Sequence, residues 1–230
     1  MYREWASGIP GVIAWVSTPD PAGPAGNTVL PDGCMDLIWH EDGLLVAGPD
    51  TRAQFSDLAA RRKLAAVRFA PGLGPVFLGV DASELRDRRV SLDQIWSPRR
   101  VRDIVAAVED DPVFGLVHAA RRDLDEAPRS PLSGLAHAFA SGMTVADAAT
   151  AAGWSERTLR RRAHQAFGYG PKTLSRVLRF RRAVERARAG EDPARVAAEC
   201  GYSDQSHLAR EVRALSGSTL GDLVRPRSGP

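Results

Sequence analysis

The sequence has few residues of the kinds that form disulfides, metal sites or membrane spans. Its 230 residues include two cysteines, Cys34 and Cys200, which lie far apart, and five histidines. Neither a disulfide framework nor a metal site is therefore expected, and nothing indicates a cofactor. No uninterrupted apolar run approaches the length of a bilayer-spanning helix. These scarcities predict a soluble protein of the reducing cytoplasm with no membrane partner.

Lysine is also scarce, because Lys63 and Lys172 are the only two, and arginine carries nearly all of the positive charge. That charge is unevenly divided along the chain. Residues 131–230 contain 16 basic and 9 acidic residues, a net charge of +7, whereas residues 1–130 contain 15 and 19, a net charge of −4. Since attraction to phosphates supplies much of the affinity of proteins for nucleic acids, the C-terminal part is expected to bind one.

The N-terminal part has the pattern of short strands separated by turns. A brief apolar run at 12–16, a hairpin at 34–48 around the turn HEDG and a run at 64–72 predict strands, and a short helix is expected near Ser83. Residues 98–128 have helical spacing instead. These patterns predict a small β-rich domain at 1–97 and a helical connector at 98–128, which either packs on that domain or forms a dimer interface.

Two prolines and charged residues at 126–131 interrupt both patterns and mark a domain boundary, after which residues 129–230 read as almost wholly helical. A turn of glycine, aromatic residue and serine occurs twice there, at 153–155 and 201–203. Glycine suits a left-handed turn, and Ser203 is expected to cap the next helix. A helix with one apolar stripe follows each turn, ending at Gly168 or Gly217, and a long helix lies between the copies.

This repeat predicts two helix-turn-helix units joined by a long helix. The fold class is therefore expected to be α+β, with a small β-rich N-terminal domain, a helical connector and an all-α C-terminal domain. Opposite its apolar stripe, each helix after a turn presents groups that hydrogen-bond base edges or phosphates. These outward positions are Arg157, Arg160, Arg161 and His164 in the first copy and Ser206, Arg210 and Arg213 in the second. The alternative is that both faces are merely solvated.

Residues 133–224 resemble the DNA-binding module of the AraC/XylS family of transcription regulators. Three segments carry the resemblance in order and spacing: GWSERTLRRRAHQAFG (153–168), GPKTLSRVLRFRRA (170–183) and GYSDQSHLAREVRALSG (201–217). The resemblance implies a sequence-specific regulator whose two recognition helices enter successive major-groove segments on one face of duplex DNA. By motif position, it implies DNA contacts for Arg157, Arg160 and Arg161 and for Gln205, Ser206, His207 and Arg210.

The N-terminal part is similar to a poorly characterised module that often precedes such DNA-binding domains. The similarity lies in LPDGCMDLIW (30–39), VRFAPG (67–72) and LRDRRVSLDQIW (85–96). AraC-type regulators commonly carry an effector-sensing β-barrel at this place, so the resemblance implies an effector-binding role without naming the effector. It leaves open whether RNA polymerase or a second copy of the chain is a further partner.

Asp32, Cys34, Asp36 and His40 lie close together and raise a different hypothesis. In one continuous strand, these even-numbered side chains would share a face. A thiol-dependent enzyme or sensor with an accessory DNA-binding module is therefore one alternative, but no complete nucleophile–base pair can be assembled, so we favour a structural cysteine and expect no catalytic residue. A protein-interaction adaptor, whose basic helices meet an acidic partner, is another alternative.

The tryptophans of the N-terminal part also have two interpretations. Trp5, Trp15, Trp39 and Trp96 could line an aromatic pocket for a planar effector. Packing in the core explains them as well, and it is the interpretation that we favour.

Overall fold

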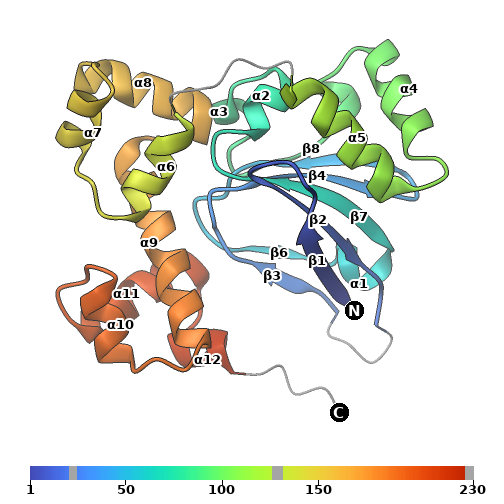
Figure 1. The fold of residues 1–230 in the computed structure, drawn as a ribbon. Coiled ribbons are helices and arrows are strands. Elements are labelled where there is room, and N and C mark those ends of the chain that lie inside the picture. Colours follow the sequence, from blue (N-terminus) through green and yellow to red (C-terminus); the bar gives the residue numbers. More distant parts are fainter. Residues whose placement is uncertain (21–24, 126–131, 226–230) are drawn as a thin grey trace.

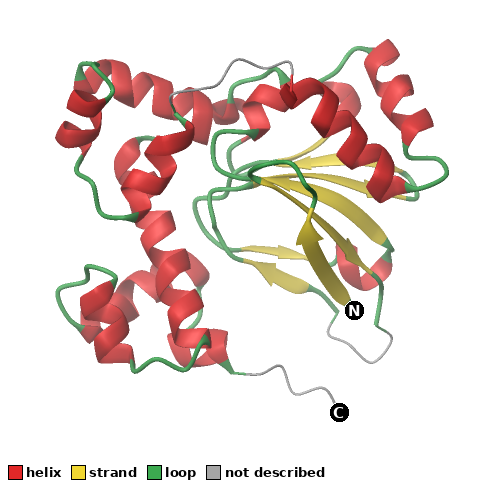
Figure 2. Cartoon of the chain, in the orientation of Figure 1, coloured by secondary structure: helices red, strands yellow, loops and turns green. Residues whose placement is uncertain are grey.

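The computed structural model describes residues 1–20, 25–125 and 132–225 (Figures 1 and 2). A β-sheet region at the N-terminus is followed by helices and by an all-helical C-terminal part, which confirms the predicted α+β class. The boundary predicted at 126–131 lies outside the described residues. None of the helices in the described ranges combines the length and the apolar character that a bilayer-spanning helix requires.

The main sheet has six antiparallel strands in the order β1-β2-β7-β4-β5-β8. Their bounds are Tyr2–Ala6 for β1, Val12–Ser17 for β2, Met35–His40 for β4, Gly43–Ala47 for β5, Leu64–Phe69 for β7 and Arg89–Ser91 for β8. Strands β3 (Asn27–Val29) and β6 (Gln54–Ser56) form a separate pair. The predicted hairpin is β4 with β5, in which His40 lies opposite Gly43. Strands β1, β3 and β6 were not predicted from the sequence pattern.

The main hydrophobic core lies between one face of this sheet and the helices that cover it. These helices are α2 (Gly74–Leu78), α3 (Ala82–Leu85), α4 (Pro98–Ala107) and α5 (Pro112–Asp125) (Figure 1). Leu37, Val67 and Phe69 of the strands and Leu116 of α5 belong to one buried cluster. The helical pair at 98–125 therefore packs on the sheet, which agrees with the first of its two interpretations. On the opposite face, a smaller cluster includes Trp15 and contacts α1 (Leu58–Arg61).

The C-terminal domain has two separate cores, and the long helix α9 (Pro171–Arg188) contributes to both. Helices α6 (Ser133–Ala140), α7 (Val145–Ala151) and α8 (Glu156–Phe167) surround the first core, and α10 (Pro193–Glu199), α11 (Gln205–Ser216) and α12 (Leu220–Val224) surround the second. Leu174 and Val177 of α9 are buried in the first core, and Phe180 and Val184 in the second. The two helix-turn-helix units joined by a long helix are thus confirmed.

The two turns agree with the prediction in their glycines but not in both caps. Gly153 and Gly201 have φ angles of +66° and +76°, the left-handed conformation expected of them. The prediction that Ser203 caps α11 is wrong. Asp204 is the capping residue, and its carboxylate accepts a hydrogen bond from the backbone N–H of His207 at 2.6 Å. The second turn is one residue longer than the first, so the capping position falls on this aspartate.

We predict that Leu116→Ala will destabilise the N-terminal domain by roughly 2–5 kcal/mol, because it removes a fully buried side chain that joins α5 to the sheet. The measurement is urea-induced unfolding. Val105→Ala on α4 is the matched control, because Val105 is 48% exposed and its truncation should cost less than about 0.5 kcal/mol. Equal effects of the two substitutions would contradict the packing of α5 on the sheet.

Candidate nucleic-acid interface

Helix α8 presents a cationic face to solvent. Leu159, Ala163 and Phe167 are buried on its inner side, and Ser155 caps its start by accepting a hydrogen bond from the backbone N–H of Thr158. The outward positions expected from the sequence are all exposed: Arg157, Arg160, Arg161 and His164. Arg160 forms an ion pair with Glu156 at 3.1 Å, one turn earlier. Because exposed pairs of this kind are weak, the pair does not prevent Arg160 from binding a phosphate or a base.

Helix α11 is built in the same way. Leu208, Val212 and Leu215 are buried, whereas Ser206, Arg210 and Arg213 are exposed, as the helical projection predicted. Its outer face therefore combines a hydroxyl group with two guanidinium groups, which can hydrogen-bond base edges as well as phosphates.

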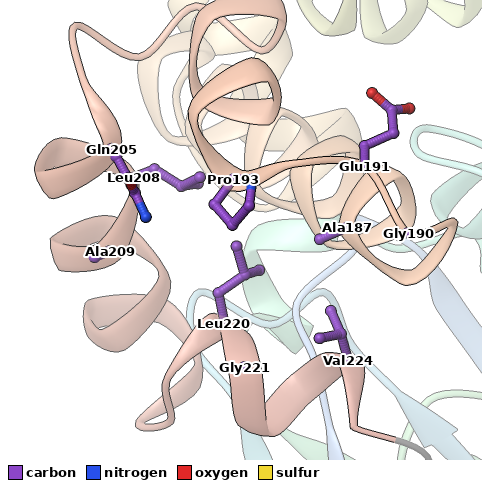
Figure 3. A pocket seen from close by; sticks show the side chains of 10 residues that line it. All are labelled: Ala187, Gly190, Glu191, Pro193, Gln205, Leu208, Ala209, Leu220, Gly221 and Val224. Carbon is purple, nitrogen blue, oxygen red and sulfur yellow. The ribbon is translucent and has the colours of Figure 1, made fainter.

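The structure places Gln205 and His207 away from the centre of this outer face. Gln205 lines a cavity of about 360 Å³ beneath α11, together with Leu208 and Leu220 (Figure 3). The ring of His207 is half-buried, with Nδ1 3.1 Å from the Ser203 hydroxyl oxygen, and it is nearly perpendicular to the ring of Tyr202, with 5.3 Å between the ring centres. Gln205 thus lies at the edge of the outer face, and His207 is engaged in the turn.

An ion pair that the sequence analysis missed holds α11 against α9. The guanidinium group of Arg176 donates two hydrogen bonds to the Glu211 carboxylate, at 2.7 and 3.1 Å, and Arg179 lies 3.9 Å from the same carboxylate. The hydrogen bonds from Arg176 lower the pKa of Glu211. Lys172, Arg176 and Arg179 are spaced by three or four residues, so they share one side of α9. That spacing indicates a basic side of α9 from the sequence, but it does not identify Glu211 as the partner.

Each turn also has its aromatic residue covered by an arginine. The guanidinium carbon of Arg162 lies 4.3 Å from the ring centre of Trp154, and that of Arg179 lies 4.6 Å from the ring centre of Tyr202. Stacking of this kind holds the guanidinium group against the turn. Arg162 and Arg179 are therefore supporting residues, a role that the sequence pattern did not predict for either.

The surroundings of Cys34 disfavour the reactive form of its thiol. Cys34 is buried, and desolvation, followed by the nearby charge of Asp32, raises the pKa of its thiol. A raised pKa disfavours the thiolate that a nucleophile or a redox sensor needs. In the described parts of the chain, no three His, Cys, Asp or Glu side chains are placed to hold a metal ion.

Asp32, Cys34, Asp36 and His40 do not lie on one continuous strand, so the condition under which they would share a face is not met. Strand β4 begins only at residue 35, and Gly33 has a φ angle of +81°, so the alternation does not extend back to Asp32 and Cys34. The Asp36 carboxylate accepts hydrogen bonds from the indole N–H of Trp15 and from Nε of Arg68, at 2.6 and 3.1 Å. Nδ1 of His40 accepts a hydrogen bond from the backbone of the following turn. These two residues therefore support the sheet and its hairpin.

The four tryptophans do not line one pocket. Trp15 and Trp96 are buried in clusters on opposite faces of the main sheet, and Trp39 is partly buried against the larger cluster. Trp5 is 43% exposed on β1. Core packing thus accounts for three of them, and Trp5 lies at the surface.

Two family models match separate parts of the chain. Residues 148–225 match a helix-turn-helix domain, and residues 13–91 match a domain of unknown function (DUF6597). A comparison with curated protein sequences finds no significant match.

Among solved structures, the chain is similar to crystal structures of ToxT from Vibrio cholerae. One has 9% sequence identity and a TM-score of 0.47, with 97% of each chain covered. The apo form of a ToxT variant has 10% identity and a TM-score of 0.46, covering 93% of this chain and 97% of the other. ToxT bound to an unsaturated fatty acid has 7% identity and a TM-score of 0.46, covering 93% and 94%.

We predict that Glu211→Gln will lower the free energy of unfolding at pH 7 and that this difference will disappear at low pH. The lowered pKa means that the ionised carboxylate stabilises the folded state fully above the ordinary pKa of a glutamate, and that this stabilisation is lost as the pH falls through the lower folded-state pKa. The measurement is urea-induced unfolding of the parent and of Glu211→Gln at several pH values from 3.5 to 7, which gives the difference in their free energies of unfolding. Glu41→Gln is the control, because Glu41 is exposed. A difference that is constant with pH would contradict the role of the ion pair.

Proposed function

We propose that the chain is a DNA-binding transcription regulator that reads duplex DNA with the outer faces of α8 and α11, a proposal supported by the match of residues 148–225 to a helix-turn-helix domain. The observation that carries this proposal is the repeat itself: two helices, each docked by a buried stripe, expose polar and cationic groups on the opposite side. The proposed contacts are Arg157, Arg160, Arg161, His164, Ser206, Arg210 and Arg213. Gln205 contributes from the edge of α11, and His207 acts through the turn.

We propose different contributions from the two helices. The outer face of α8 carries three arginines, so it contributes more of the electrostatic affinity for DNA phosphates. The outer face of α11 combines Ser206 with Arg210 and Arg213, and arginine can pair bidentately with guanine. Helix α11 is therefore proposed to contribute more of the discrimination between sequences.

The N-terminal domain is proposed to modulate DNA binding in response to an effector or a partner. We retain a division into this domain (1–97), a helical connector (98–128) and the DNA-binding domain (129–230). RNA polymerase and a second copy of the chain are proposed as further partners, with the cytoplasm as the location. We propose no catalytic activity, and the raised pKa of the buried Cys34 thiol disfavours the thiol-dependent alternative in particular.

We predict that the full-length protein will bind duplex DNA selected from a random pool, and that its affinity will fall steeply with salt, because phosphate contacts release bound cations. Footprinting on the selected DNA should show two protected major-groove segments roughly 10 bp apart. The measurement is titration of labelled duplex at several salt concentrations, with a shuffled duplex of equal length as the control. Binding that is absent or independent of salt would overturn the proposed function, and protection of a single segment would leave one unit without a reading role.

We predict that Arg210→Ala will weaken binding to the selected DNA by roughly 1–3 kcal/mol and relax the preference at one base position, as expected when a base contact is lost. Competition titrations with single-base variants of the duplex measure both effects. Arg195→Ala is the matched control, since Arg195 is an exposed arginine of the same domain on α10. Equal losses on every duplex would instead identify Arg210 as a phosphate contact.

A further inference from the structure

The mutual orientation of the two helix-turn-helix units is not set by a common core. In the described residues, the apolar side chains around α8 and those around α11 form separate clusters, and α9 links them along its length. Buried contacts of α9 fix how each unit sits on the helix. Bending or twisting of α9 between Leu178 and Phe180, where its contacts pass from one core to the other, would therefore turn one unit relative to the other.

A loop of the N-terminal domain, residues 48–53, contacts the C-terminal ends of both recognition helices. Pro49 lies so close to Gly168, the capping residue of α8, that a Cβ atom at 168 would be 2.7 Å from its ring. The backbone N–H of Ala53 donates a hydrogen bond of 2.7 Å to the carbonyl oxygen of Leu215 in the last turn of α11. The last carbonyl groups of a helix lack partners within the helix, so they accept such a bond readily.

A second segment of the N-terminal domain, residues 30–33, also touches both units. Leu30 packs against the second core, which includes Phe180 and Val184 of α9. Gly33 lies against the first core, because a Cβ atom there would be 3.5 Å from the hydroxyl oxygen of Tyr169 and 3.6 Å from Leu178. The N-terminal domain therefore bridges the two units at two separate places.

The 48–53 loop is itself held firmly. Asp50 is buried and receives two hydrogen bonds from Arg89, at 2.9 and 2.6 Å. Thr51 donates from its backbone N–H and its hydroxyl group to Asp87, and the backbone N–H of Asp87 donates to the carbonyl oxygen of Pro49. A loop with so many bonds to residues 87–89 resists movement, so it can transmit a fixed separation to the two helix ends it contacts.

We propose that the N-terminal domain clamps the two helix-turn-helix units in one mutual orientation and thereby selects the spacing of the DNA segments that they read. The proposal rests on the proposed function for its DNA consequence. Each base pair added between two segments turns one relative to the other by roughly a tenth of a turn. Two helix-turn-helix units held in one orientation bind poorly to segments rotated in this way. Two units joined only by α9 can change their orientation and bind such segments.

The first experiment measures spacing preference in the full-length protein. The selected DNA is rebuilt with base pairs inserted or removed between its two protected segments, and the affinity for each spacing is measured. Ala53→Pro removes the N–H that donates to Leu215, and Ala53→Ser, which keeps it, is the matched control. Leu30→Ala removes the second bridge, and Val29→Ala is its control on the neighbouring exposed residue.

We expect Ala53→Pro and Leu30→Ala to reduce the preference for the best spacing about two- to tenfold, the change in an equilibrium that one lost contact of this kind produces. Ala53→Ser and Val29→Ala should retain the preference of the parent. An unchanged preference in the folded Ala53→Pro and Leu30→Ala proteins would overturn the clamp. An equal loss of affinity at every spacing would also overturn the clamp. Such a loss would indicate weaker DNA binding in general and not a less restricted orientation of the two units.

The second experiment needs no DNA. Spin labels are attached to Ala151→Cys in the first unit and Ala214→Cys in the second, both at exposed positions, after the buried Cys34 and Cys200 are replaced by alanine. The distance distribution between the labels should be narrow in this parent and broader when Ala53→Pro or Leu30→Ala is added. Distance distributions of equal width in the parent and in these variants would overturn the clamp, whatever the DNA-binding results. Failure of the parent to bind DNA would overturn the proposed function alone.

Discussion

The burial of α9 in two different cores is the interaction on which the rest of the structure depends. Its first half is covered by helices of one helix-turn-helix unit and its second half by helices of the other. Because each unit is fixed to α9 by buried apolar contacts, both recognition helices are attached to the same long helix and present their outer faces to solvent. The Arg176–Glu211 ion pair adds a polar contact that holds α11 to the same helix.

The N-terminal domain contributes contacts that no helix-turn-helix unit supplies for itself. Its 48–53 loop meets both recognition helices at their C-terminal ends, while their capped N-terminal ends lie in the turns. The domain thus touches both helices without covering the arginines on their outer faces. This arrangement provides a physical route by which a change inside the N-terminal domain can alter DNA binding, namely through the relative placement of two helices.

Much of the candidate interface was predictable because it depends on local periodicity. The buried stripes of Leu159 and Leu208 and the exposed arginines on the opposite sides follow from helical spacing, and the turn glycines follow from their left-handed conformation. The cap of α11 was not predicted, since Ser203 and Asp204 can both accept the capping hydrogen bond. The roles of Arg162 and Arg179 were missed as well, because helical projection cannot show which arginine stacks on an aromatic ring.

By itself, the sequence determined the α+β class, the two helix-turn-helix units and the outer faces of α8 and α11, since each of these is encoded by residues close together in the chain. Only the tertiary structure decided that Cys34 is buried and that the pKa of its thiol is raised, that Glu211 pairs with Arg176, and that residues 30–33 and 48–53 bridge the two units. The physical reason is that these contacts join segments far apart in sequence. Their formation depends on how the sheet, α9 and the two cores pack together, which no local pattern records.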